Sequence, residues 1–212
     1  MFHMEQYTNV SCETILPKGG IDMLYGIDVS EHNGEIDWKA IKNAGMQFAI
    51  IRCSFGMSED SRFVENVYNA TKAGLMCGAY HYSYATTSQR AFDEAKFVSQ
   101  LIKDSGCFLG LPIFLDMEDA DGFKSQRMDI TRQAITEIAE TFIFRLRNEY
   151  DVGLYANLDW LERLIDWQRI GCAVWCAQWG SRDDFRGYAW QFTDSLNIQG
   201  KLFDGDVIYT GE

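Results

Sequence analysis

From about residue 25 onward, short strand-like runs alternate with helix-like runs, and no other feature of this sequence limits its fold as strongly. A chain that alternates in this way builds β/α units around a parallel sheet. The early strands are expected at residues 25–29, 48–53, 75–84, 111–115 and 152–155. The first part of the chain therefore predicts a repeated strand–helix unit.

Capping residues mark the boundaries of the helices between these strands. Asp37 is expected to cap the first helix and Gly45 to end it. Thr87 or Ser88 is expected to cap a later helix, and apolar residues at helical spacing over 131–146 predict the clearest amphipathic helix. Each predicted helix separates two predicted strands, as in a β/α barrel.

The rhythm changes after a short helical piece at 158–165. Strands are expected at 173–177 and 188–192, with only ten residues between them. A parallel crossover normally needs about a dozen residues or more, so we expect later strands that are joined without helices, some of them antiparallel. The fold class is thus α/β, an irregular TIM-like β/α barrel over 25–212, preceded by an N-terminal extension over 1–24.

Composition excludes several classes of partner. The 31 acidic residues outnumber the 19 basic ones, and a net charge of −12 repels a polyphosphate backbone, so no nucleic acid partner is expected. No run approaches the ~20 apolar residues of a membrane helix, which argues against membrane insertion. The first 24 residues contain no continuous apolar segment typical of a secretory signal, so we expect any export to use another route.

Cysteine and histidine usage gives no sign of a metal or cofactor. The six cysteines form no CxxC pair and are expected to be free thiols. His3, His32 and His81 do not share the spacing of a metal site. A G-x-S-x-G elbow, the mark of many serine hydrolases, does not occur. We therefore expect neither a metal nor any other cofactor.

The segment 111–119 is an apolar strand that becomes acidic at its C-terminal end, where β/α barrels collect catalytic groups. Asp116 and Glu118 are two residues apart, so on a strand they share one face, with Cα atoms about 6.6 Å apart. Two carboxyls in a partly desolvated cleft do not both ionise easily, and one stays protonated near neutral pH. Cleavage of a glycosidic bond needs such an acid. The alternative is that both residues cap a helix or lie solvated in a loop.

Two further acids are predicted at the same opening. Asp28 ends the first strand, and Asp206 lies at the edge of the last one. Each alone has the sequence context of a turn residue. Together with the pair at 116 and 118 they predict an acidic ring around the barrel mouth.

Aromatic residues cluster at these strand ends, where flat rings suit sugar rings. Alternation places Tyr80, Tyr82 and Tyr84 on one face and His81 on the other, so His81 is predicted to be a satisfied core residue. The remaining rings of the cluster are Tyr155, Trp175 and Trp179.

Several motifs follow one another along 25–209: GIDVS at 26–30, HNG at 32–34, DW at 37–38, AIIR at 49–52, GAYHY at 78–82, LDME at 115–118, WCAQW at 175–179, WQF at 190–192, and Asp206. In this order they resemble the motifs of the Chalaropsis-type lysozymes, glycoside hydrolase family 25. The resemblance implies an eight-stranded barrel that lacks its last helices. It also implies cleavage of the β-1,4 bond between N-acetylmuramic acid and N-acetylglucosamine in peptidoglycan.

The resemblance also implies roles for individual residues. Glu118 would be the general acid that later activates water, and Asp116 would assist the 2-acetamido group of the substrate. A direct carboxylate nucleophile is the open alternative to this route. Asp28 and Asp206 would match the two remaining acidic positions, although Asp204 competes with Asp206 for the second. The substrate-binding residues would be Tyr80, Tyr82, Tyr155, Trp175, Gln178, Trp179 and Gln191.

On this hypothesis the partner is the peptidoglycan glycan strand and the protein acts on the bacterial cell wall as a monomer. It would reach the wall as a phage endolysin or as an autolysin exported by a non-classical route. Two alternatives remain open: a non-catalytic sugar-binding barrel, and a chitinase-like enzyme that shares the acetamido chemistry.

Overall fold

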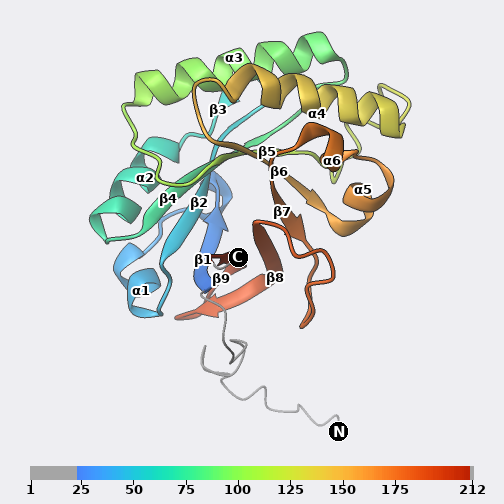
Figure 1. Cartoon of the computed structure of the whole chain (residues 1–212). Coiled ribbons are helices and arrows are strands. Elements are labelled where there is room, and N and C mark those ends of the chain that lie inside the picture. The colour runs from blue at the N-terminus through green and yellow to red at the C-terminus, as the bar shows by residue number, and fades with distance from the viewer. Residues whose placement is uncertain (1–22, 211–212) are drawn as a thin grey trace, which may run out of the picture.

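Hydrogen bonds between the first two long strands close the sheet of this chain into a barrel, as seen in the computed structural model, which describes residues 23–210 (Figure 1). The sheet has nine strands in the order β1-β9-β8-β7-β6-β5-β4-β2-β3. The short β3 pairs with β2 as a hairpin, and the other eight strands form the barrel. The barrel strands are β1 (Met23–Val29), β2 (Phe48–Phe55), β4 (Met76–Tyr82), β5 (Ile113–Asp116), β6 (Val152–Asn157), β7 (Ala173–Ala177), β8 (Ala189–Ile198) and β9 (Lys201–Tyr209).

Helices follow the early strands and are missing after the late ones, as the sequence predicted. A 3₁₀ turn, η2 (Glu31–Asn33), follows β1, and β3 covers Ser58–Glu59. The helices are α1 (Trp38–Asn43), α2 (Phe63–Lys72), α3 (Ser88–Ser105), α4 (Arg132–Leu146), α5 (Leu158–Arg163) and α6 (Trp167–Ile170). Asp37 caps α1 and Thr87 caps α3 through their side-chain oxygens, which confirms both predicted helix starts.

Strand direction departs from a regular β/α barrel only at the end of the chain. β7 pairs with β8 in parallel, although the connection over 178–188 contains no helix. β9 runs antiparallel to both β8 and β1. The expectation of helix-free late connections and of antiparallel pairing is therefore confirmed, with β9 as the antiparallel strand.

Alternation along the strands separates two apolar layers. Phe48, Phe114 and Trp175 fill the barrel interior, whereas their strand neighbours pack outward against the helices. Gly26 faces the interior, where a Cβ atom would lie 2.5 Å from the Phe48 ring, so only glycine fits beside that ring. Gly153 has the same relationship to Phe114, at 2.5 Å.

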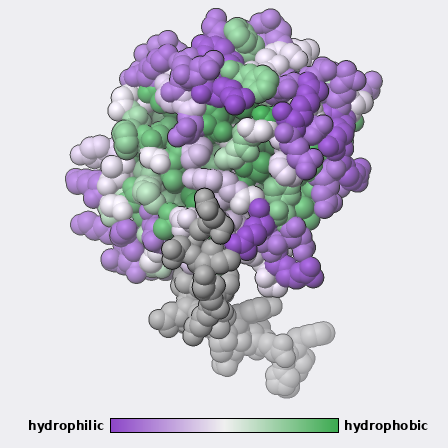
Figure 2. Space-filling view, in the orientation of Figure 1, coloured by the Kyte–Doolittle hydropathy of each residue, from purple (hydrophilic) through white to green (hydrophobic). Residues whose placement is uncertain are grey.

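The outer helices expose their polar sides. Figure 1 shows α3 and α4 side by side along one flank of the barrel, while no helix accompanies β8 and β9. In the same orientation, Figure 2 shows mostly hydrophilic residues along the outer helices and hydrophobic residues gathered in the middle of the face. This is the distribution expected for amphipathic helices packed on a sheet.

Three further expectations concern the start of the barrel domain, the state of the cysteines and membrane insertion. β1 begins at Met23, two residues before the predicted boundary, and the rest of the predicted extension lies outside the described residues. Within the described part, Cys53, Cys77, Cys107, Cys172 and Cys176 are free, as predicted, and Cys12 lies outside it. No helix within 23–210 has the length and apolar character needed to cross a membrane.

Candidate active site

Three aspartates meet inside one end of the barrel. Asp28 lies at the C-terminal end of β1 and Asp116 ends β5, while Asp206 comes from β9, which enters the same space from the opposite direction. Their side chains share the inward parity of Phe114 and Ile208. Asp28, Asp116 and Asp206 are 5%, 4% and 0% exposed, so all three carboxyls are buried at the barrel mouth.

Glu118 lies two residues beyond the end of β5 and is half-buried. The residue between it and Asp116, Met117, packs into the outer apolar layer, so Asp116 and Glu118 are directed to the same side of the chain, as predicted. Burial raises the pKa of Asp116, and the charge of Glu118 raises it further. Burial also raises the pKa of Glu118, with Lys124 acting against the shift. Both shifts favour the retention of a proton by the pair.

The acids on β1 and β9 also raise one another's pKa. Burial, followed by the charge of Asp204, raises the pKa of Asp28, and burial, followed by the charge of Asp28, raises the pKa of Asp206. Burial and the charge of Asp194 raise the pKa of Asp204 to about 6. Asp206 is the deeper of the two acids on β9, and Asp204 lies half-buried nearer the opening, opposite Asp28 in the strand register. Both therefore belong to the acidic ring, which is larger than the sequence predicted.

One buried carboxylate oxygen in the ring, Asp116 Oδ1, has no hydrogen-bond partner among the described residues, whereas the carboxyl of Asp206 shares a side-chain hydrogen bond with that of Asp28. An ionised oxygen without a donor is costly in a desolvated site, so Asp116 favours the protonated carboxyl. Asp206 Oδ1 accepts a hydrogen bond from Trp175 Nε1 at 2.9 Å. The indole of Trp175 and the carboxyl of Asp28 therefore fix the position of Asp206.

Gln191 connects the aromatic residues to the acids. Its Nε2 donates to Asp28 Oδ2 at 2.7 Å, and its Oε1 accepts from Tyr155 Oη at 3.0 Å and from Trp179 Nε1 at 3.1 Å. Trp179 is 62% exposed, so its ring lies at the rim of the mouth. The structure thereby brings together Gln191, Tyr155 and Trp179 with Asp28, all of them predicted site residues.

Other predicted residues take different positions. Trp175 is buried, contacts the rings of Tyr80 and Tyr155, and fills the barrel beneath the acids. Gln178 is directed away from the ring, because its side-chain amide donates to Asp184 Oδ2 at 2.6 Å and accepts from Asp184 N at 2.9 Å. Trp175 therefore supports the site from beneath, and the side chain of Gln178 is held by the loop that carries Asp184.

His81 is the core residue that the sequence predicted. It is fully buried, its ring nitrogens contact Ser54 Oγ at 2.8 Å and Glu94 Oε2 at 3.1 Å, and its ring stacks on Phe142. No group of three or more His, Cys, Asp or Glu side chains within 23–210 has the arrangement of a metal site.

Sequence reasoning missed a buried lysine beside the acids. Lys124 is 1% exposed, and its Nζ donates to the backbone carbonyl oxygen of Glu118 at 2.7 Å and to that of Ser83. Burial lowers the pKa of Lys124, and its charge lowers the pKa of both Asp116 and Glu118. No spacing signal marks this residue, because its carbonyl partner in Ser83 is 41 positions away.

Sequence reasoning also missed an arginine at the mouth. Arg52 Nε donates to Asp60 Oδ2 at 2.8 Å, and its Nη2 lies 3.3 Å from Glu31 Oε1. Its charge opposes the rise in the pKa of Asp116 that burial and Glu118 produce. Arg52 therefore adds positive charge next to the acidic ring while its own charge is balanced by two carboxylates.

An open cavity of about 460 Å³ lies at the mouth, large enough for a sugar unit. Its lining includes Tyr82, Arg52 and Asp121, together with Glu31, His32, Phe55, Tyr84 and Ala120. Tyr82 lines this cavity and also lies near the acids, because the charges of Glu118 and Asp116 add to burial in raising the pKa of its hydroxyl group. Tyr82 therefore connects the acid pair to a space in which a saccharide fits.

A β/α barrel whose mouth holds a ring of carboxyls with raised pKa values has the scaffold of a glycoside hydrolase. The chain belongs to glycosyl hydrolases family 25, whose family model matches residues 27–201. Lysozyme M1 of Streptomyces globisporus is 32% identical over 161 residues, which cover 73% of this chain and 54% of that protein.

Solved structures agree with the fold. The modular autolysin LytC of Streptococcus pneumoniae, in complex with a synthetic peptidoglycan ligand, aligns with a TM-score of 0.80 and 26% identity over 88% of this chain and 47% of that one. The bacterial lysozyme of Streptomyces coelicolor aligns with a TM-score of 0.69 and 23% identity over 89% of this chain and 93% of that one. This chain spans about half the length of Lysozyme M1 and of LytC, with 54% and 47% of each covered.

Proposed function

We propose that this chain is a muramidase, which hydrolyses the β-1,4 bond between N-acetylmuramic acid and N-acetylglucosamine in peptidoglycan. The observation that carries the proposal is the Asp116–Glu118 pair, whose carboxyls have raised pKa values and lie near Tyr82, which lines the mouth cavity. Membership of family 25 and the similarity to Lysozyme M1 support the substrate class. The proposed site of action is the bacterial cell wall, and one barrel carries the whole acidic ring, so we propose a monomer.

In the proposed mechanism Glu118 is the general acid. Its proton passes to the glycosidic oxygen as the bond to the anomeric carbon breaks, and the resulting carboxylate then takes a proton from the water that completes hydrolysis. Between these steps the anomeric carbon is held by the oxygen of the substrate's own 2-acetamido group, with Asp116 orienting that group, and the configuration is retained. The alternative is a direct bond to the Asp116 carboxylate.

The other site residues have supporting roles in this proposal. Asp28 and Asp206, with Asp204 beside them, set the charge of the ring and hence the proton held by the pair. Tyr80, Tyr82, Tyr155 and Trp179 offer ring faces and hydroxyl groups to the sugar, and Gln191 fixes two of them. Trp175 acts from behind, through its hydrogen bond to Asp206, and Gln178, which bonds Asp184, is given no role.

The decisive variant is Glu118→Gln, which keeps the shape of the side chain and removes its acid. We expect it to lose at least about a hundredfold in the rate at which a peptidoglycan suspension clears, the usual size of a general-acid contribution. The matched control is Glu65→Gln, an exposed residue of α2 that should retain full activity. Unchanged clearing by Glu118→Gln would contradict the acid assignment.

Mass spectrometry of the released fragments identifies the bond. Products that end in reducing muramic acid are expected from peptidoglycan, and none from chitin oligomers. Products from chitin alone would favour the chitinase-like enzyme instead. Binding to glycan strands without release of reducing ends would favour the non-catalytic barrel.

A further inference from the structure

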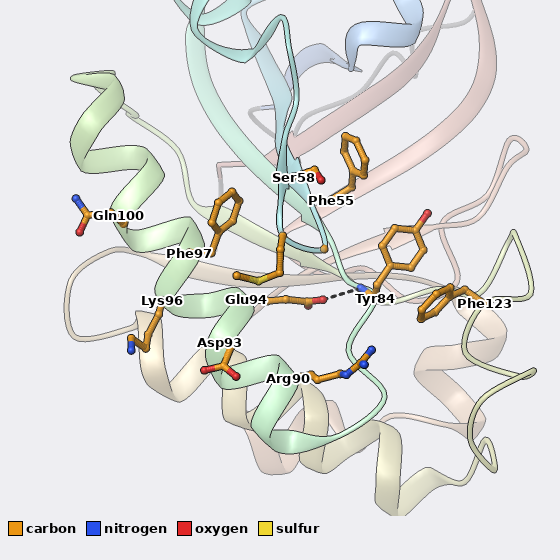
Figure 3. Close-up of a pocket in the computed structure, with 12 residues that line it drawn as sticks. Phe55, Ser58, Tyr84, Arg90, Asp93, Glu94, Lys96, Phe97, Gln100 and Phe123 are labelled. Atoms are coloured by element: carbon orange, nitrogen blue, oxygen red, sulfur yellow. Dashed lines mark hydrogen bonds between the residues drawn. The ribbon is translucent and has the colours of Figure 1, made fainter.

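A second and larger cavity, of about 920 Å³, lies outside the barrel between α3 and the β2–β3 hairpin (Figure 3). One side is formed by the hairpin residues Gly56, Met57 and Ser58, and the opposite side by α3. Aromatic rings line it from both directions, namely those of Phe55, Tyr84, Phe97 and Phe123. Its size matches a ligand as large as a short peptide.

This cavity adjoins the mouth cavity, because Phe55 and Tyr84 line both. The ring of Tyr84 contacts that of Tyr82, the tyrosine beside the acids, with ring centroids 5.1 Å apart. Two residues of extended chain span at most about 7 Å. A group attached to a sugar in the mouth therefore needs only a short linker to enter the second cavity.

The charges that the cavity offers to a ligand are unequal. Glu94 is buried, and its carboxylate is occupied by Ser83 Oγ at 2.6 Å, His81 Nε2 at 3.1 Å and Tyr84 N at 3.0 Å. The exposed Asp93 accepts from Gln89 Nε2 on the same helix.

Arg90, by contrast, forms no side-chain hydrogen bond or ion pair with any residue in the range 23–210. Figure 3 shows it extending from α3 toward the side of the cavity formed by Tyr84 and Phe123. An arginine without a partner is unusual in a chain of net charge −12, and its planar guanidinium matches a carboxylate in two-point geometry.

We infer that this second cavity binds the peptide stem of peptidoglycan, with Arg90 pairing a stem carboxylate. The inference rests on the proposed function, since the stem branches from the muramic acid that would occupy the mouth. Stem peptides are short chains of small and acidic residues, and their methyl groups suit the rings and Met57 while their carboxylates suit Arg90. A further N-acetylglucosamine unit carries no charge for this arginine to bind, and the lactyl carboxyl of a stem-bearing muramic acid is neutral because it is in amide linkage.

Two substrates test the inference: glycan strands that carry their stems, and the same strands from which an amidase has removed them. Arg90→Glu should lower the ratio of kcat/KM on stem-bearing to stem-free strands by about tenfold, and Arg90→Lys by less. The control Lys39→Glu makes the same charge change at an exposed residue of α1 and should leave the ratio unchanged. An equal loss on both substrates would assign the cavity to sugar and overturn the inference, as would an unaltered ratio.

A binding measurement separates failure of the inference from failure of the proposed function. In the Glu118→Gln chain, titration with a soluble N-acetylmuramoyl peptide followed by calorimetry should give an affinity that Arg90→Glu weakens by about tenfold. If the unmodified chain releases no reducing ends from either substrate, the muramidase proposal fails while this titration still tests the cavity. Equal affinity with and without Arg90→Glu overturns the cavity assignment alone.

Discussion

The ammonium group of Lys124 donates a hydrogen bond to the backbone carbonyl oxygen of Glu118 at 2.7 Å. The same ammonium group bonds the carbonyl of Ser83, just after β4, so one buried side chain ties the end of β5, which carries the acid pair, to the end of the neighbouring strand. A lysine this deeply buried is rare unless it is paired. Lys124 therefore fixes the position of Glu118 and supplies a positive charge beneath it.

Lys124→Met should shift the pH dependence of activity upward. The lysine charge lowers the pKa of both Glu118 and Asp116, so its removal raises both values and moves the two limbs of the kcat/KM profile to higher pH. The variant should also lose about 2 kcal/mol of unfolding free energy, because two buried carbonyl groups lose their donor. A pH–rate profile and urea unfolding measure the two effects, and a profile that stays in place would contradict the electrostatic role.

Asp116→Asn should stabilise the fold at pH 7 while it impairs catalysis. Burial raises the pKa of Asp116 above its unfolded value. At pH 7 the unfolded chain carries an ionised, solvated carboxylate, and burying that charge in the folded state lowers the unfolding free energy. Removing the charge should add about 1 kcal/mol to the unfolding free energy at pH 7, with little gain at pH 4. Urea titrations at the two pH values test this, and a loss of stability at pH 7 would refute it.

The unfolding free energy of the whole chain should fall as pH rises from about 4 toward 7. Every acid of the ring has a folded-state pKa above its unfolded value, so its stabilising proton is present below the unfolded pKa and is lost as pH rises through the folded pKa, about 6 for Asp204. Glu149 acts in the opposite sense: its contribution is present above its ordinary pKa of 4.5 and is lost as pH falls toward the folded value of about 2, so it offsets the ring only at the acidic end of this range.

Calorimetry or urea unfolding across the same pH range checks this trend. Asp204→Asn should flatten the part of the curve between pH 4 and 6, whereas Asp104→Asn, an exposed change on α3, should not. A stability that rises steadily to pH 7 would mean that the ring is ionised in the folded protein.

Trp179→Ala should raise KM without unfolding the chain. The indole is 62% exposed at the rim and is held by Gln191, so its loss removes a face for sugar stacking and little packing. We expect KM to rise several-fold, kcat to change less, and the melting temperature to stay within about two degrees. The control is Phe108→Ala, 82% exposed in the loop before β5 at the other end of the barrel, which should leave KM unaltered.

The sequence predicted the barrel and the position of its acids for one physical reason. Side chains alternate along a strand, so an apolar strand that ends in Asp116 and Glu118 fixes which way both residues face. The same rule placed His81 in the core. Contacts between distant loops have no such pattern, and for this reason the lysine that supports Glu118 was missed.

Membership of a family motif predicted less well than side-chain alternation which residues face the acidic ring. Gln178 and Gln191 both occur in family motifs, yet they face opposite ways: Gln191 bonds Asp28, and Gln178 bonds Asp184 in the loop over 178–188. Trp175 has the parity of a site residue but lies one layer deeper, where it bonds Asp206. Depth within a barrel depends on strand stagger, which the sequence of one strand does not reveal.

The antiparallel course of β9 makes the order of synthesis matter. Within the barrel this strand is made after the other seven and pairs with β1, Met23 opposite Tyr209, and it also supplies Asp204 and Asp206. A nascent chain that still lacks β9 has two unpaired sheet edges, at β1 and β8, and only part of its acidic ring. The barrel and its chemistry are therefore completed in the same late event, so a partly translated chain has no finished site with which to act.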